Sequence, residues 1–594
     1  MKKKILSSFF FISILTLASV SEKDSETINL NKFKKIEAKT VVYTKDPVTL
    51  NTKFNTDSVS IVKYYTPPKE MFRTTWVASV ENLNFPKATV INGEKVIRNS
   101  VEELKSDWIK ILDVHEKLNF NAVIYQVSPT LDAVYKSKNR PWSHVLTGEQ
   151  GVEPYWADDF DLLQWMINET HKRGMEFHAW FNPYRVTHVG PSNASFKTEI
   201  NKLSKNNFAR KNPELVYMFD NKLYLNPGED RVIKHVTDTI SEFLSAYDVD
   251  AIHFDDYFYP YKSQKNGKEL YFGDNFEDKK TFAKNPHGFS SVEDWRRDNV
   301  NRLILSVKNT IDEYNKKNKR SVQWGISPFG IWDHKKNTLY GSDTPTSATA
   351  SAKDIYADTR KWVINEYIDY ITPQVYWEFD QPAAPYGEIT NWWAKQMQNT
   401  RTQLYIGHSS YKHSFCLKNS NWKNYEEIPN QMKFNQKYDE IQGSVFFGYK
   451  DLVAENDKYD IVTSTKNKHI TMLKEKFFYT KALTPAKPWL DKMETERIKS
   501  FKVIKNKNDY SIRFNDSLKN DSRFYVVYIF NNKNLNTSDP KNIYKIVGRE
   551  YSQVGQSISI DKNRLANNEY IGISIKDRSG VETPVKIVHL KNKI

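Results

Sequence analysis

The sequence predicts an α/β protein in which a (β/α)₈ TIM barrel is followed by a small β-sandwich. Eight short apolar, β-rich runs alternate with helical patterns over residues 75–447. After about residue 480 the helical period disappears and short alternating strands follow. Alternation of strand, loop and helix eight times is typical of a barrel with parallel strands. A doubly wound open sheet is the alternative, but no glycine-rich phosphate loop follows the first run.

The predicted barrel strands cover residues 75–80, 120–127, 176–181, 249–254, 322–326, 370–375, 404–407 and 444–447. Helical patterns separate them. Ser100 and Glu103 form a capping box before an apolar stripe at three- and four-residue spacing over residues 101–115. A second stripe over residues 160–171 ends before Gly174, where a helix C-cap glycine is expected, and a third covers residues 232–243.

The C-terminal part predicts short strands over residues 509–514, 523–530, 557–560 and 570–575, separated by Asn, Asp, Lys and Gly turns. We therefore expect a barrel domain over 71–482, a linker at Pro485 and Pro488, and a fibronectin III-like β-sandwich over 490–594. Residues 22–70 are polar and predict an N-terminal extension with short β-like pieces.

The N-terminus predicts export. Lys2, Lys3 and Lys4 precede an apolar run over residues 5–17, and small residues follow it, which is the layout of a secretory signal peptide over 1–21. The run is short for a permanent membrane span, although an uncleaved anchor is the alternative. No later segment is long and apolar enough to form a stable span. We expect a periplasmic, cell-surface or secreted protein.

Composition narrows the class of protein. The 594 residues include 39% apolar, 14% aromatic and 27% charged residues, which excludes a disordered or fibrous chain. The net charge of +15 is scattered as single lysines and forms no long basic arm, so a nucleic-acid partner is not expected. Cys416 is the single cysteine, which excludes an intrachain disulfide and a cysteine-rich zinc site.

Polar and aromatic side chains stand at the predicted C-terminal ends of the strands, where barrel enzymes carry their catalytic residues. They are Gln126, Asp132, His178, Trp180, Asn182, Tyr184, Arg185, His253, Asp255, Asp256, Tyr257, Ser327, Gln374, Tyr376, Trp377, Glu378 and His408. Carboxylates that transfer protons, amides and arginine that bind hydroxyls, and rings that stack on sugars are the groups that a glycosidase needs.

Asp255 and Asp256 are the strongest candidates for catalysis. Two adjacent acids after an apolar strand point to different sides, so one of them faces the barrel axis. An Asp-rich turn is the structural alternative. Glu378 follows two aromatic residues and fits a solvated rim acid as well as a catalytic one. The tryptophans that fit either sugar stacking or core packing are Trp142, Trp180, Trp332 and Trp377.

Long motifs over residues 70–450 support this interpretation. The stretches FRTTWVASVENLNFP, NAVIYQVSPTLDAVY, PWSHVLTGEQG, FHAWFNPYRV, YLNPG, VDAIHFDDYFYPY, RRDNVNRL, WGISPFGIW, YADTRKWV, YITPQVYW and LYIGHSSYK resemble, in this order, the glycosyl hydrolase-like 10 family of secreted bacterial proteins. The resemblance implies a (β/α)₈ barrel with glycosidase activity on a bacterial polysaccharide, with members associated with cell-wall glycan. We expect no cofactor and no metal.

The resemblance also marks individual positions. The matching residues are Asp132, Asn182, Arg185, Asp255, Asp256, Asp358, Gln374 and Tyr376. Two positions differ from the family pattern. Ser128 stands where a QVRP-type motif has Arg, and Glu378 lies just past the matching YW in a variable region. Glu378 and Asp358 are the candidate proton donors.

Two other functions remain open. A metal-dependent polysaccharide deacetylase also uses an FDD-like strand end, with histidines as further ligands, for which His408 and His413 are the available pair. A non-catalytic glycan-binding barrel would keep the groove, but the presence of both Asp255 and Asp256 argues against it.

Overall fold

The computed structural model describes residues 47–50, 59–91, 93–191, 194–265, 267–273, 277–414, 421–455, 461–491, 498, 500–513, 522–531, 535–548, 557–565 and 570–590. The predicted signal peptide and the first half of the N-terminal extension lie outside these residues. No helix within them is both long enough and apolar enough to cross a bilayer.

Eight parallel strands close a barrel, as predicted. In chain order they are β3 (Phe72–Val77), β6 (Ala122–Ser128), β7 (Glu176–Phe181), β10 (Ala251–Phe254), β13 (Gln323–Ile326), β14 (Tyr370–Ile371), β15 (Gln403–His408) and β16 (Ile441–Phe446). Their spatial order follows the chain, and β16 pairs with β3 to close the ring. The carboxyl ends of all eight strands therefore meet at one mouth.

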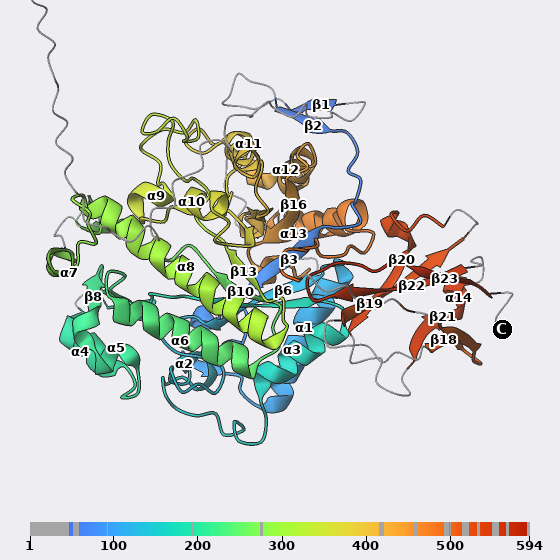
Figure 1. Ribbon diagram of the computed structural model, residues 1–594, viewed down its shortest axis with the longest axis horizontal. Coiled ribbons are helices and arrows are strands. Elements are labelled where there is room, and N and C mark those ends of the chain that lie inside the picture. Colours follow the sequence, from blue (N-terminus) through green and yellow to red (C-terminus); the bar gives the residue numbers. More distant parts are fainter. Residues whose placement is uncertain are drawn as a thin grey trace, which may run out of the picture. The chain divides into compact units, whose positions relative to one another are not determined.

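Helices lie on the outside of the strands (Figure 1). They are α1 (Val101–Lys117), α2 (His144–Thr147), α3 (Leu162–Lys172), α4 (Phe196–Lys202), α5 (Phe208–Lys211), α6 (Asp230–Ala246), α7 (Lys279–Lys284), α8 (Val292–Asn318), α9 (Ser351–Asp354), α10 (Thr359–Ile364), α11 (Tyr386–Gln396), α12 (Glu427–Asn435) and α13 (Ile461–Met472). Short hairpins are formed by β1 (Pro47–Leu50) with β2 (Val59–Val62), β4 (Ala88–Ile91) with β5 (Glu94–Ile97), β8 (Val216–Phe219) with β9 (Lys222–Leu225), and β11 (Ser263–Lys265) with β12 (Lys268–Leu270).

The predicted helix signals are confirmed. The Ser100 hydroxyl accepts the Glu103 N–H, as in the predicted capping box at the start of α1, while the Glu103 carboxylate accepts the Ser100 hydroxyl rather than its backbone N–H. Leu104, Trp108 and Ile111 are buried on one face of this helix. Gly174 adopts a φ of +72° just after α3, in the left-handed region that a glycine C-cap occupies.

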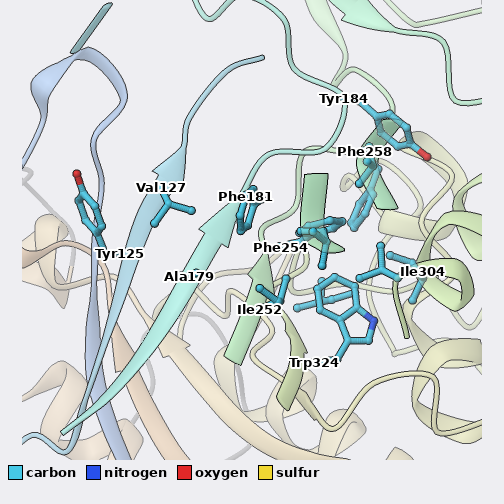
Figure 2. Close-up of a cluster of buried hydrophobic side chains, with 14 of the residues drawn as sticks. Tyr125, Val127, Ala179, Phe181, Tyr184, Ile252, Phe254, Phe258, Ile304 and Trp324 are labelled. Carbon is cyan, nitrogen blue, oxygen red and sulfur yellow. The ribbon is translucent and has the colours of Figure 1, made fainter. Parts of the chain in front are cut away.

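Side chains of the barrel strands alternate between the inside and the outside of the barrel. Figure 2 shows part of the outer layer, with Val127, Phe181 and Phe254 on β6, β7 and β10, and Trp324 on β13 near Ile304 of α8. The side chains that alternate with these along each strand point into the barrel. The polar strand-end residues Gln126, Asn182 and Asp255 continue this inward series, which places them at the mouth.

Aromatic rings fill the inside of the barrel because glycines on neighbouring strands leave room for them. A Cβ on Gly325 would lie 1.9 Å from the Tyr370 ring, and one on Gly443 would lie 2.6 Å from the Tyr405 ring. Real Cβ atoms do not approach so closely, so each large ring depends on a neighbouring glycine. The barrel is therefore a packed core rather than a pore.

Two predicted strands differ in their bounds. The first strand begins at Phe72 rather than at residue 75. It ends at Val77 because the Ala78 N–H donates to the Asn84 side-chain oxygen in a turn. The sixth strand is shortened to Tyr370–Ile371, because Pro373 has no N–H to donate to a ladder. Gln374 still forms an isolated parallel bridge to Gly407, so the direction of the strand is kept.

Two antiparallel sheets form the C-terminal part. One contains β17 (Lys502–Lys505), β18 (Asp509–Arg513) and β21 (Ile558–Asp561), followed by α14 (Lys562–Leu565). The other contains β20 (Ile543–Gly548), β19 (Ser522–Phe530), β22 (Tyr570–Asp577) and β23 (Lys586–His589). Val503 and Ile512 of the first share a buried core with Tyr525 and Ile573 of the second. The strand-rich sandwich is thus present, while its likeness to fibronectin III stays a prediction.

The segment expected to be a linker lies against the amino ends of the barrel strands. Leu483 exchanges backbone hydrogen bonds with Lys69 and Met71 just before β3, at 2.8 and 2.9 Å. The buried Lys487 ammonium donates to the Tyr405 hydroxyl inside the barrel at 3.0 Å. Trp489 donates to Asp369 at 2.8 Å. Residues 483–489 therefore form a floor that closes the barrel opposite its mouth.

Candidate active site

Asp255 and Asp256 follow β10 at the mouth of the barrel. Asp255 continues the inward series of Ala251 and His253 and is 4% exposed. Asp256 is half-buried and accepts a hydrogen bond from the Tyr261 hydroxyl. The two neighbouring carboxyls thus have different hydrogen-bond partners.

An amide network fixes the Asp255 carboxylate. The Asn182 side-chain amide donates to both of its oxygens at 2.7 Å, and the Tyr257 N–H donates to one of them at 3.1 Å. The Asn182 carbonyl in turn accepts Gln126 Nε2 at 2.7 Å and Arg185 Nη2 at 2.9 Å. Three sequence-predicted residues from β6 and the segment after β7 therefore hold one carboxylate of the pair.

The pair retains protons at higher pH than ordinary aspartates. Burial, followed by the charge of Asp256, raises the pKa of Asp255 to about 6, although Arg185 and Asn182 act in the opposite direction. Burial also raises the pKa of Asp256, against the hydrogen bonds from Tyr261 and Gln374. Two adjacent carboxyls with raised pKa values can hold one proton between them near neutral pH, which suits acid–base catalysis.

Aromatic rings lie beside the pair. Burial raises the pKa of the Tyr376 hydroxyl well above its ordinary value, and the charges of Tyr411, Asp256 and Asp255 add to the shift. The Tyr376 ring is T-shaped to Trp76 at 6.5 Å and stacked with Phe447 at 6.2 Å. On the other side of the pair, the Arg185 guanidinium lies over the Tyr257 ring at 4.6 Å.

Asp132 lies in the loop after β6 and is buried. It contacts His144 Nδ1 at 3.3 Å and accepts Gln150 Nε2 at 3.2 Å. Burial acts to raise the pKa of Asp132, but the hydrogen bond and charge of His144, together with hydrogen bonds from Gln150 and Thr130, outweigh it, and the pKa lies below its usual range. At Ser128, where the family pattern has Arg, the Arg140 guanidinium donates to the serine hydroxyl at 2.6 Å, so a guanidinium still reaches this loop.

Glu378 lies on the loop after β14 and is half-buried. Its carboxylate accepts the Asn421 N–H at 2.9 Å, and it acts electrostatically on Lys412, whose ammonium donates to the Tyr376 carbonyl. Gln374, four residues earlier, donates to the Ser327 carbonyl at 2.9 Å and to Asp256. Gln374 thus belongs to the pair, whereas Glu378 is tied to the loop that follows β15.

Asp358 has a structural role that the sequence did not reveal. Its carboxylate accepts Trp332 Nε1 at 2.9 Å and caps the N-terminus of α10 through the Lys361 N–H. Asp358 thus caps a helix, and its role as a proton donor stays a prediction. Its Trp332 partner stacks on Trp392 at 5.9 Å and so packs within the fold.

The predicted histidines are buried below the mouth. His178 and His253 both contact the Tyr370 hydroxyl, at 2.8 and 2.9 Å, inside the barrel. His408 lies between Gln431 and Ser444, and all three histidines are 0% exposed. We expected them to touch substrate. They have no exposed surface in this structure, and substrate contact stays a prediction.

The remaining aromatic candidates divide by burial. Trp180 and Tyr184 are buried, although Trp180 Nε1 finds no hydrogen-bond partner in the described part of the chain. Trp142 and Trp377 are half-buried, and Trp377 is T-shaped to Phe329 at 5.4 Å. Trp377 therefore offers partly exposed ring surface on a loop after a barrel strand, as Tyr257 and Tyr376 also do.

Sequence reasoning missed Trp76, Tyr261 and Phe447 near the pair. Trp76 is inward-facing on β3, and its position in an alternating strand could have identified it. Tyr261 lies five residues after Asp256 in the YFYPY run, which is a usable signal. In the described residues no group of three or more His, Cys, Asp or Glu is placed to hold a metal ion. His413, considered for such a site, contacts the Trp422 carbonyl at 3.1 Å.

Comparisons with known proteins agree with the motifs. The profile of the glycosyl hydrolase-like 10 family matches residues 71–424. A glycosyl hydrolase, YngK, of Bacillus subtilis (strain 168) is 37% identical over 465 residues, covering 77% of this chain and 82% of that protein. Another, DigH of Escherichia coli (strain K12), is 36% identical over 388 residues, covering 63% and 82%. A glycoside hydrolase domain of PgaB (BpsB) from Bordetella bronchiseptica aligns at a TM-score of 0.40 with 11% identity, over 68% of this chain and 98% of that one.

Proposed function

The chain belongs to the glycosyl hydrolase-like 10 family, and on this premise we propose that it is an exported glycoside hydrolase acting on a bacterial polysaccharide. Glycan strands of the cell wall (peptidoglycan) are the substrate that we favour. The N-terminal signal pattern supports export to the place where such strands occur.

One observation carries the proposal: two adjacent carboxyls with raised pKa values lie at the mouth of a closed parallel barrel. Glycoside hydrolysis needs a carboxyl that is protonated near neutral pH beside one that is ionised. Asp255 is the main catalytic carboxylate in this proposal. Gln126, Asn182 and Arg185 keep it in position.

Endo action on a polymer is part of the proposal. Partly exposed rings on loops after several strands, including Tyr257, Tyr376 and Trp377, offer surfaces for successive sugars. The C-terminal sandwich supports the barrel or contacts polymer and does no chemistry. Its lysines also suit an anionic wall, an attraction that salt should screen.

The test is digestion of purified glycan strands, with and without stem peptides, by the mature chain. Internal cleavage by the wild type and loss of cleavage in Asp255→Asn would support the proposal. Asp312→Asn is the matched control, because it changes an exposed carboxyl on α8 outside the candidate site. Release of single sugars from chain ends would refute endo action. Binding of glycan without any cleavage would favour the non-catalytic alternative.

A further inference from the structure

Other carboxyls near the strand ends are engaged locally. Those that follow β6, β14 and β16 most closely are Asp132, Glu378 and Asp451, which bind His144, the Asn421 N–H and Ser414. The charged groups that act most strongly on Asp255 are its neighbour Asp256 and Arg185. Among the carboxyls that directly follow the barrel strands, Asp255 and Asp256 are thus the two that lie next to each other.

An adjacent pair sets a geometric limit. Both carboxyls come from the same strand end, with their Cα atoms about 3.8 Å apart, so they approach a bound sugar from one edge. The usual retaining mechanism instead places an acid and a nucleophile on opposite sides of the glycosidic bond. The pair can supply a proton and a fixed negative charge, but an in-line nucleophile must come from elsewhere.

We propose that the nucleophile is the 2-acetamido oxygen of the substrate itself, with Asp255 orienting the acetamido group and Asp256 acting as acid and base. This inference rests on the proposed glycosidase function and adds the class of sugar, a 2-acetamido-2-deoxy residue on the non-reducing side of the cleaved bond. Neighbouring-group participation of this kind is a known route in other glycosidases.

The steps balance without any further reactant. The acetamido oxygen forms a bond to the anomeric carbon while the bond to the leaving oxygen breaks, and Asp256 gives its proton to that oxygen. The acetamido N–H is held by Asp255, which stabilises the positive charge of the resulting oxazolinium ring. Water then attacks the anomeric carbon, Asp256 takes its proton, and the ring opens to restore the acetamido group. Two displacements at one carbon retain the anomeric configuration.

The contacts of each carboxyl assign the two roles. Asp255 is 4% exposed and receives two hydrogen bonds from the Asn182 amide and one from the Tyr257 N–H, which favours the ionised form that an acetamido N–H requires. Asp256 is half-buried, so it is the carboxyl with access to a glycosidic oxygen. The Tyr261 hydroxyl holds it in place.

The aromatic cluster of Trp76, Tyr376 and Phe447 fits an acetamido group. The methyl of this group is apolar, and the rings lie beside the carboxyl pair, with Tyr376 and Phe447 half-buried. Burial of a methyl group against aromatic rings is favourable, because it removes apolar surface from water. Asp255 and the cluster together thus match both the polar and the apolar end of the group.

The experiment uses the full mature chain and two glycans that differ only in the acetamido group: a 2-acetamido polymer and its N-deacetylated form. We expect cleavage of the first with retention of configuration, followed by NMR, and at least about 100-fold slower cleavage of the second. N-acetylglucosamine-thiazoline, a stable mimic of the oxazoline, should bind in calorimetry. Asp255→Asn should weaken this binding at least tenfold, while Glu81→Gln, a change of an exposed rim carboxyl, should not.

A second pair of measurements separates the roles. Asp256→Asn should slow cleavage of natural glycan but spare aryl glycosides with good leaving groups, whereas Asp255→Asn should slow both. Inversion of configuration, equal cleavage of the deacetylated glycan, or a glycosyl group trapped covalently on a carboxyl would overturn the inference while leaving the glycosidase function intact. Failure of the wild type to cleave any glycan would overturn both.

Discussion

The Asn182 side-chain amide donates to both carboxylate oxygens of Asp255, at 2.7 Å each. Its orientation is determined by its other end, since the Asn182 carbonyl accepts Gln126 and Arg185. A rotated amide would lose these two donors and would turn an oxygen toward a carboxylate. The position of the Asp255 carboxylate therefore depends, through the Asn182 amide, on the positions of β6 and of Arg185.

We predict that Asn182→Ala shifts the acidic limb of the pH–rate profile upward and lowers kcat. The amide lowers the pKa of Asp255, so its loss raises that pKa further and demands a higher pH for ionisation. The measurement is kcat against pH on soluble oligosaccharides, with Asn206→Ala at an exposed position as the control. An unchanged profile would show that Asn182 does not set the ionisation of Asp255.

Asp255→Asn should raise thermal stability at pH 7.5 while it removes activity. The pKa of Asp255 rises from 3.8 to about 6 on folding, so its contribution to stability is fully present below pH 3.8 and is lost as the pH rises through 6. The carboxylate therefore costs up to about 3 kcal/mol above that range, and the neutral amide avoids this cost. Differential scanning calorimetry at pH 4.5 and 7.5 should show a gain in Tm that is larger at pH 7.5. An equal change at both values would contradict the assignment.

Gly325→Ala should prevent normal folding or lower the Tm severely. The added Cβ would lie 1.9 Å from the Tyr370 ring, which is buried and contacts His178 and His253. Gly387→Ala on α11 is the matched control, because its Cβ would lie 3.5 Å from the nearest side chain, the Phe434 ring. There the alanine should be neutral or should stabilise by about 1 kcal/mol. Similar Tm values for the two variants would argue against the packing described for the barrel interior.

Arg523→Met should destabilise the protein by about 3–5 kcal/mol, because it leaves the buried Asp250 carboxylate without its arginine partner. Arg523 donates to Asp250 at 2.7 Å and to Asp248 at 3.0 Å, which lie just before β10. The measurement is chemical unfolding, with Arg513→Met on the exposed face of β18 as the control. Equal unfolding midpoints for the two variants would show that the ion pairs add nothing to stability.

A chain ending near Lys487 should cleave short soluble oligosaccharides but unfold at a lower temperature. It keeps the mouth and most of the floor, but it lacks Arg523 and Arg578, which bind Asp248. The measurements are Tm and turnover on short substrates. A folded truncation without activity on these substrates would show that the sandwich takes part in the chemistry.

Much of the fold could be predicted from the sequence, because hydrophobic periodicity and the residues that cap helices and form turns are local properties of the chain. All eight runs became barrel strands, and the Ser100 helix cap and the Gly174 turn occur where they were predicted. The floor was not foreseen. Pro485 and Pro488 indicate an extended segment, but whether such a segment is covered by solvent or by a barrel depends on contacts between distant residues, such as Lys487 with Tyr405.

The candidate site was predictable at the level of strand ends and less so at the level of single residues. Gln126, Asn182 and Asp255 meet because parallel strands bring their ends together. The depth of a side chain along the barrel axis cannot be read from a strand pattern. His178 and His408 were therefore expected at the surface of the mouth, although they lie in the interior.

The floor also constrains the order of folding. Leu483 pairs with residues on either side of Glu70, and Lys487 reaches Tyr405, so the base of the barrel is completed by the part of the chain that is synthesised after all eight strands. Until that part has left the ribosome or an export channel, Glu176, Gln403 and Tyr405 lack the partners that residues 484–487 provide. Consolidation of the barrel is therefore a late step with high contact order, and such steps are slow.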